Sequence, residues 1–281
     1  MNIQWFPGHM TKTMRLIEEN IKLVDIVVEI LDARLPKSSK NPEIDNLVKD
    51  KPRLILLNKS DIADANETSK WINKFQKEGI SAIAISSIGP KSLDVVLDKC
   101  KEVLKDKIEA WKKRGIVNRS VKIMVVGVPN VGKSSFINKI ANKKSAKVGD
   151  KPGVTRGKQW IRLAKGFEML DTPGVLWPKF EDMEIGMKLA FTGAVKDEIM
   201  DVELLSMKLL EFLKENYPDS LTQRYKMEDF FDLDGYEMLT LLGKKRGFVI
   251  SGGEIDTLRA ANILLDEFRG AKLGRITLDK A

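Results

Sequence analysis

Several features that would place a chain in a large class of proteins are scarce in this sequence. Cysteine occurs once, at Cys100, and histidine occurs once, at His9. One cysteine cannot form an internal disulfide, and these two residues cannot supply a four-ligand metal site. No apolar stretch approaches the roughly 20 residues that cross a membrane, and the N-terminal segment lacks the apolar core of a signal peptide. We therefore expect a protein without a membrane span that works in the reducing cytoplasm, with Cys100 as a packing residue.

Charge is abundant but unevenly distributed along the chain, whose net charge is +8. Residues 1–194 carry 35 basic and 23 acidic side chains, whereas residues 195–281 carry 13 and 17. In the densest basic stretch, 139–165, nine lysines and arginines face Asp150 alone. Such a run is usually a solvated surface, but it also suits contact with the phosphate backbone of RNA. The candidate RNA contacts are Lys143, Lys144, Lys147, Lys244, Lys245 and Arg246.

A glycine-rich segment, Gly127-Val128-Pro129-Asn130-Val131-Gly132-Lys133-Ser134, follows an apolar run. The run 121–126 predicts a buried strand, and the spacing of 133–140 predicts a helix. Glycines at such a turn let main-chain N–H groups approach phosphate oxygens, which the helix dipole also attracts. Lys133 would reach the β and γ phosphates, and Ser134 would bind Mg²⁺. The alternative is a glycine-rich turn without function, which the complete motif in this context disfavours.

Two further segments supply candidate ligands for Mg²⁺ and the γ-phosphate. Asp171 follows the apolar residues 167–170, where a carboxylate at a strand end would hold the hydration shell of Mg²⁺. The N–H of Gly174 would meet the γ-phosphate. Thr155 is the candidate for a second hydroxyl on the metal. Asp-Thr-Pro-Gly alone is a common turn. Its assignment to Mg²⁺ and the γ-phosphate therefore depends on its position downstream of the phosphate loop. The predicted metal ligands are Ser134, Thr155 and Asp171.

Asn58-Lys59-Ser60-Asp61 has the pattern of a guanine-recognition motif and ends the apolar run 54–57. This position is the carboxyl end of a predicted strand, where ligands bind in open α/β sheets. Asp61 would accept hydrogen bonds from the guanine N1–H and N2–H₂ groups. Adenine lacks these donors and would leave a buried carboxylate without a partner. Ser86-Ser87 follows the next apolar run, 81–85, and its main-chain N–H is expected to contact the base O6.

The predicted nucleotide-binding residues come from these segments. They are Asn58, Lys59, Ser60, Asp61, Ser86, Ser87, Asn130, Val131, Gly132, Lys133, Ser134, Ser135, Thr155 and Gly174. The guanine motif precedes the phosphate loop, whereas an ordinary GTPase has it afterwards, so the motif order is circularly permuted. We expect a three-layer α/β P-loop GTPase domain over residues 1–193. A small all-α C-terminal domain is expected over 194–281.

With these motifs in place, the chain resembles the ribosome biogenesis GTPase A family over essentially its whole length. The N-terminal Trp5-Phe6-Pro7-Gly8-His9-Met10 and the C-terminal Gly252-Gly253-Glu254-Ile255-Asp256 carry the resemblance together with the five permuted motifs. The resemblance implies GTP hydrolysis during late assembly of the large (50S) ribosomal subunit, with turnover stimulated by the ribosome. It implies GTP, GDP, ribosomal RNA and ribosomal proteins as partners. We expect a monomer when the protein is free.

Two alternatives of different classes remain open from the sequence. One is a nucleotide-gated RNA-binding module in which hydrolysis only resets binding. The other is a signalling GTPase with a non-ribosomal protein partner, which the basic segment 139–165 disfavours.

The group that activates the attacking water is the least determined part of the predicted site. Val175 stands where many GTPases have a glutamine, and a hydrocarbon cannot orient water. His9 is one candidate, because a neutral imidazole can polarise water near pH 7, although it is equally a packing histidine. The resemblance implies that Asn130 helps to hold K⁺, whose charge would replace an arginine finger. The predicted catalytic residues are thus His9, Lys133 and Asn130, with Mg²⁺ and K⁺ as expected ions.

Hydrophobic periodicity predicts the remaining elements. A helix is expected over 11–24, a strand over 26–31, and helical residues over 93–113. Helices are also expected over 202–217, 236–242 and 254–268. Asp32-Ala33-Arg34-Leu35-Pro36 follows the first strand, and we interpret it either as a functional loop or as a plain turn.

Overall fold

The computed structural model describes residues 15–48, 51–86, 92–116, 118–142, 160–170, 182–195 and 201–281. The described residues form two compact units. The sheet unit contains the described residues from 15 to 170 and also Asp279–Ala281, and the helical unit contains those from 182 to 278. We describe each unit by itself.

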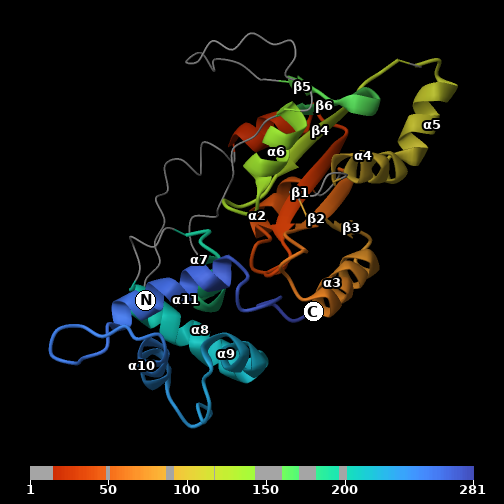
Figure 1. Cartoon of the computed structure of the whole chain (residues 1–281). Helices are drawn as coiled ribbons and strands as arrows, with labels where there is room; N and C mark the ends of the chain where they lie inside the picture. Colours follow the sequence, from red (N-terminus) through yellow and green to blue (C-terminus); the bar gives the residue numbers. More distant parts are fainter. Residues whose placement is uncertain are drawn as a thin grey trace, which may run out of the picture. The chain divides into compact units, whose positions relative to one another are not determined.

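The sheet unit is built on a six-stranded sheet. Its strands are labelled in Figure 1. They are β1 (Ile26–Asp32), β2 (Arg53–Asn58), β3 (Ser81–Ala84), β4 (Val121–Val126), β5 (Trp160–Arg162) and β6 (Phe167–Leu170). Their order is β3-β2-β1-β4-β6-β5, and all neighbours are parallel except β5 and β6. The strands predicted from the apolar runs 26–31, 54–57, 81–85 and 121–126 are confirmed. Because β1 lies between β2 and β4, the loops after these three strands meet at one edge of the sheet.

Helices cover both faces of this sheet, as expected for three layers. On one face, Val27 and Met124 pack with Ile17 of the helical residues 15–21 and with Ile44 of α2 (Pro42–Leu47). On the same face, α3 (Ala65–Lys77) contributes the buried side chains Trp71 and Phe75. On the opposite face, Val28 and Val125 line a small apolar gap together with Leu97 of α4 (Ser92–Val103) and Phe136 of α6 (Lys133–Asn142). The predicted three-layer α/β architecture is confirmed.

The segment predicted as helical over 93–113 forms two helices. The second, α5 (Lys105–Lys113), begins after a break at Leu104. Lys107 on α5 and Arg119 just before β4 both pair with Asp25, at 2.9 and 3.0 Å. These ion pairs fasten α5 and the start of β4 to the start of β1. Cys100 is buried on α4, and burial raises the pKa of its thiol to about 12, so the prediction of a packing residue is confirmed.

The helical unit consists of α7 (Met183–Phe191), α8 (Val202–Asn216), α9 (Pro218–Tyr225), α10 (Gly235–Lys245) and α11 (Thr257–Arg269). The side chain of Arg269 donates hydrogen bonds to the carbonyl oxygens of Phe191 and Ala190, at 3.0 and 2.9 Å. Because α7 packs with α8 and α11, it belongs to the helical unit. The helical unit thus includes α7, whereas the domain prediction placed the boundary after residue 193.

Three details of the helical unit differ from the sequence-based expectation. Helices α7 and α9 were not among the predicted segments. The helix predicted over 254–268 begins only at Thr257, where the side chain of Asp256 caps it by accepting from the N–H of Arg259 at 2.9 Å. Glu254 and Ile255 instead close a short turn, in which Ile255 bridges to Val249. The cap residue, rather than the apolar pattern, sets this helix start.

Candidate nucleotide-binding site

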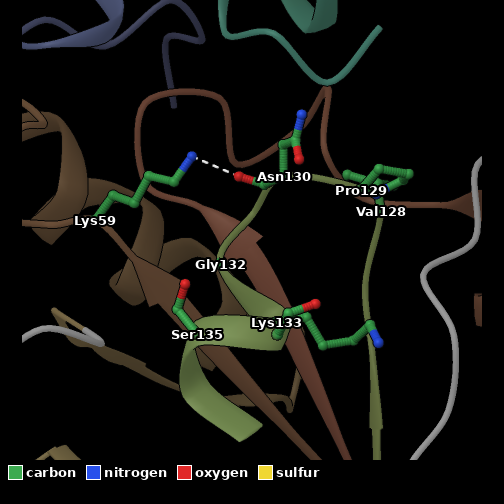
Figure 2. A pocket seen from close by; sticks show the side chains of 8 residues that line it. Lys59, Val128, Pro129, Asn130, Gly132, Lys133 and Ser135 are labelled. Carbon is green, nitrogen blue, oxygen red and sulfur yellow. Dashed lines mark hydrogen bonds between the residues drawn. The ribbon is translucent and has the colours of Figure 1, made fainter. Parts of the chain in front are cut away.

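The phosphate loop occupies the turn from β4 into α6. A side chain at Gly127 would lie 2.6 Å from the main-chain oxygen of Ile30, so the close approach of β1 requires glycine there. Gly132 has a φ of +91°, in the region that favours glycine. The loop borders a cavity of about 390 Å³ (Figure 2). The lining residues are Lys59, Val128, Pro129, Asn130, Gly132, Lys133, Ser134 and Ser135.

The first turn of α6 gives this cavity the chemistry of a phosphate site. Helix N-termini present N–H groups and a positive dipole end to anions. Lys133 is the first residue of α6 and lines the cavity, although little of its side chain is exposed. Ser134 and Ser135 follow and are exposed. An exposed hydroxyl in this position fits an oxygen-liganded Mg²⁺ ion beside bound phosphates.

The guanine motif is joined to the phosphate loop by two direct hydrogen bonds. The side-chain amide of Asn58 donates to the carbonyl oxygen of Val131 at 2.7 Å. The ammonium of Lys59 donates to the carbonyl oxygen of Asn130 at 2.6 Å, the bond drawn in Figure 2. Lys59 and Asn130 both have positive φ angles, +62° and +61°. Two conformations that cost energy by themselves are thus held together where base and phosphates would meet.

Asp32 binds the Lys59 side chain that donates to the phosphate loop, and it also binds Arg34. Its carboxylate accepts from the Lys59 ammonium at 2.8 Å and from both the Nε and a terminal nitrogen of Arg34, at 3.0 and 2.7 Å. Burial alone would raise the pKa of Asp32, but the charges of Arg34 and Lys59 outweigh it and hold the pKa well below its usual range. The carboxylate is therefore ionised at neutral pH.

Asp32 was not predicted as a site residue. The only signal for it in the sequence was the position of its loop at the carboxyl end of a strand.

The remaining guanine-motif residues are arranged toward the loop after β3. The N–H and the hydroxyl of Ser60 both donate to the carbonyl oxygen of Ile85, at 3.1 and 3.0 Å. These bonds place Ser86 next to the motif. Asp61 is exposed, which leaves its carboxylate open to a base.

Other predicted site residues lie outside the described residues. They are His9, Ser87, Lys143, Lys144, Lys147, Thr155, Asp171 and Gly174. Val175, which replaces the usual glutamine, also lies outside the described residues. Among the side chains that the structure describes, no cluster of three histidines, cysteines or acids could hold a metal ion. No helix within the same described ranges is long and apolar enough to span a membrane.

The basic residues of the described segments differ in their surroundings. Lys244 and Lys245 are exposed on the last turn of α10. Arg246 instead donates to both carboxylate oxygens of Glu267, at 3.0 Å each. Lys165, the last residue of the basic stretch, pairs with Asp98 of α4 at 2.6 Å. Arg246 and Lys165 thus have acidic partners within the fold.

Comparison with known proteins gives concordant matches. Residues 122–232 match the family described as 50S ribosome-binding GTPase. Ribosome biogenesis GTPase A of Bacillus licheniformis is 45% identical over 280 residues, which cover 100% of this chain and 99% of that protein. Mitochondrial ribosome-associated GTPase 1 of Mus musculus is 33% identical, with 99% and 90% of the two chains covered.

A solved structure agrees with these matches. The GDP-bound structure of TM YlqF aligns with a TM-score of 0.69 at 27% identity and covers 95% of this chain and 99% of its own. The permuted motifs, the joined guanine and phosphate loops and the full-length identity lead to one conclusion: this chain belongs to the ribosome biogenesis GTPase A family.

Proposed function

We propose that the protein binds GTP, hydrolyses it to GDP and phosphate, and acts in assembly of the large ribosomal subunit, which stimulates its turnover. The observation that carries the nucleotide part is the pair of hydrogen bonds from Asn58 and Lys59 to the phosphate loop. These bonds hold the guanine motif against the phosphate loop, whose residues line the cavity. The ribosomal part rests on the family and on the names of its members.

The predicted site residues have distinct roles in this proposal. Asp61 selects guanine, and the N–H groups of the loop with Lys133 bind the phosphates. Mg²⁺ neutralises charge on the β and γ phosphates when it is bound, and Ser134 is the ligand that the described residues offer it. Thr155, Asp171 and Gly174 remain predictions for the metal and the γ-phosphate.

Water activation is assigned to two groups that experiments can separate. His9 would orient the attacking water, since Val175 cannot. The exposed side chain of Asn130 would hold K⁺, whose charge would stabilise the transition state. Its main-chain carbonyl accepts the hydrogen bond from Lys59.

RNA contact is assigned to the basic stretch and to the helical domain, which was predicted over 194–281. Lys244 and Lys245 are better suited to phosphate contact than Arg246, whose charge is balanced by Glu267. Replacing Lys143, Lys144 and Lys147 with alanine should weaken binding to the particle and spare nucleotide binding. The monomeric state and the cytoplasmic location stay predictions.

Turnover measured with purified ribosomal particles tests the proposal. We expect slow GTP hydrolysis by the protein alone, faster hydrolysis with large subunits, and no comparable gain with small subunits. Lys133→Ala should abolish the stimulated rate, because its charge serves the transition state. Stimulation equal for both particles would contradict the assignment to the large subunit. A normal rate for Lys133→Ala would contradict this phosphate loop as the active one.

A further inference from the structure

The last three residues of the chain lie in the sheet unit, although the helical unit precedes them directly. The carboxylate of Asp279 accepts hydrogen bonds from the N–H and the hydroxyl of Ser38, at 2.7 and 2.9 Å. The indole N–H of Trp71 on α3 donates to the carbonyl oxygen of Asp279 at 3.0 Å, and the N–H of Ala281 donates to Glu67 at 3.3 Å. Asp279 and Ser38 are both buried. The C-terminal tail, residues 279–281, therefore binds to a defined site in the sheet unit, which we call the docking site.

The docking site lies on the loop that also carries Asp32. Ser39, next to Ser38, accepts from the N–H of Asp32 at 3.1 Å and donates its hydroxyl to Leu35 at 2.7 Å. The N–H of Leu35 in turn donates to the carbonyl oxygen of Asp32 at 2.9 Å. The loop 32–39 is therefore a compact turn with the tail at one end. At its other end, the Asp32 carboxylate holds Lys59.

Thr277, two residues before the tail, is held by hydrogen bonds within the helical unit. There, the hydroxyl of Tyr217 donates to the carbonyl oxygen of Thr277 at 3.1 Å and accepts from its N–H at 3.2 Å. The chain passes from one unit to the other at Leu278. The tail therefore follows directly from the helical unit in the chain and binds Ser38 on the loop 32–39.

We propose that Asp279 is a positioning residue for guanine nucleotide binding: by holding Ser38, it keeps the loop 32–39 in the conformation that sets Asp32 against Lys59. The inference rests on the proposed role of Asn58–Asp61 in base recognition. The hydrogen bonds described above join Asp279 to Ser38 and Trp71, which do not line the cavity, so we expect it to act on nucleotide affinity rather than on hydrolysis. This assigns to the C-terminal tail a role that none of the five motifs predicts.

The test compares Asp279→Ala and Ser38→Ala with wild type in the full-length chain. A charge-assisted hydrogen bond is stronger than a neutral one, so Asp279→Ala should weaken affinity for a fluorescent GDP analogue about 10-fold. Ser38→Ala keeps the main-chain bond and should weaken it about 3-fold. The KM for GTP should rise in parallel, while kcat at saturating GTP stays within about twofold, because the phosphate-binding residues are unchanged.

A matched control separates positioning from loss of stability. Ser206→Ala removes another buried hydroxyl, which donates to the carbonyl oxygen of Ala261 at 3.1 Å within the helical unit. It should leave GDP affinity unchanged even where the unfolding temperature falls. The double variant Ser38→Ala/Asp279→Ala should bind GDP no worse than Asp279→Ala, because both changes break the same contact.

Hydrogen exchange of the amides 37–41, which include the Ser38 N–H that donates to Asp279, reports whether the tail has been released. Faster exchange together with weaker GDP affinity supports the proposal. Faster exchange with unchanged affinity overturns it, and unchanged exchange in Asp279→Ala overturns the docking contact itself. Should Asp279→Ala fail to fold, Ser38→Ala decides between the same outcomes.

Wild-type preference for GDP over ADP is measured in parallel. Its absence would refute the proposed base recognition rather than the role of the tail.

Discussion

Lys59 and Asn130, 71 residues apart in the chain, are joined by a hydrogen bond of 2.6 Å from an ammonium to a main-chain carbonyl oxygen. Both residues have positive φ, so each is held in a conformation that it would rarely adopt alone. The bond exists because β1 places the loops after β2 and β4 on either side of Asp32. The predicted base-recognition and phosphate-binding loops are therefore joined through this bond as well as through the bond from Asn58 to Val131.

Replacing Asp32 with asparagine tests this dependence. Lys59 and Arg34 would lose their carboxylate, and removing one member of a buried ion pair typically costs about 3 kcal/mol of unfolding free energy. Affinity for a fluorescent GDP analogue should fall about 10-fold, since Lys59 would no longer be fixed against Asn130. Asp45→Asn is the control, because Asp45 pairs with Lys40 and Arg53 in the same unit, away from the cavity. Equal GDP affinity for wild type and Asp32→Asn would show that Lys59 needs no such support.

Asp61→Asn should exchange the base preference of the protein. An amide presents a donor to guanine where the carboxylate accepts, whereas xanthine carries a carbonyl at that position. We expect GDP affinity to fall by roughly 100-fold or more and xanthosine diphosphate to bind better than GDP. Competition titrations with both nucleotides measure this. Unchanged GDP affinity would remove Asp61 from the base site.

Potassium dependence tests the role of the Asn130 side chain. Turnover of wild type should be faster in K⁺ than in Na⁺ at equal ionic strength, because K⁺ would supply positive charge at the transition state. Asn130→Ala should remove the difference and keep the Na⁺ rate. The main-chain carbonyl that accepts from Lys59 is present in this variant as well. Identical wild-type rates in the two salts would argue against a K⁺ site.

The helical unit should lose stability in acid through Glu267. Hydrogen bonds from Arg224 in particular, together with the charge of Arg246, hold the pKa of Glu267 at about 2. A carboxylate with a lowered pKa stabilises the fold at neutral pH, and this contribution disappears as pH falls from about 5 toward 2. It amounts to roughly 1–3 kcal/mol, reduced by partial solvent exposure of the arginines.

Thermal unfolding of Glu267→Gln and wild type over pH 2–7 checks this expectation. The difference between them should be largest at pH 7 and vanish near pH 2. Exposed Glu228→Gln is the control and should show no such trend. A difference that stays constant with pH would mean that Glu267 acts through packing alone.

The sequence by itself determined the class, the motif order and the central strands of this protein. Apolar runs such as 121–126 and 26–31, each with a single charged residue, are long enough to specify buried strands. The phosphate loop needs glycine and lysine at fixed local spacing. Local chemistry therefore suffices for these features. Only the tertiary structure decided that Asp32 supports Lys59, that Arg246 pairs with Glu267, and that Asp279 docks on Ser38. These contacts join residues between 21 and 241 positions apart, and they follow from strand order and helix packing rather than from any local pattern.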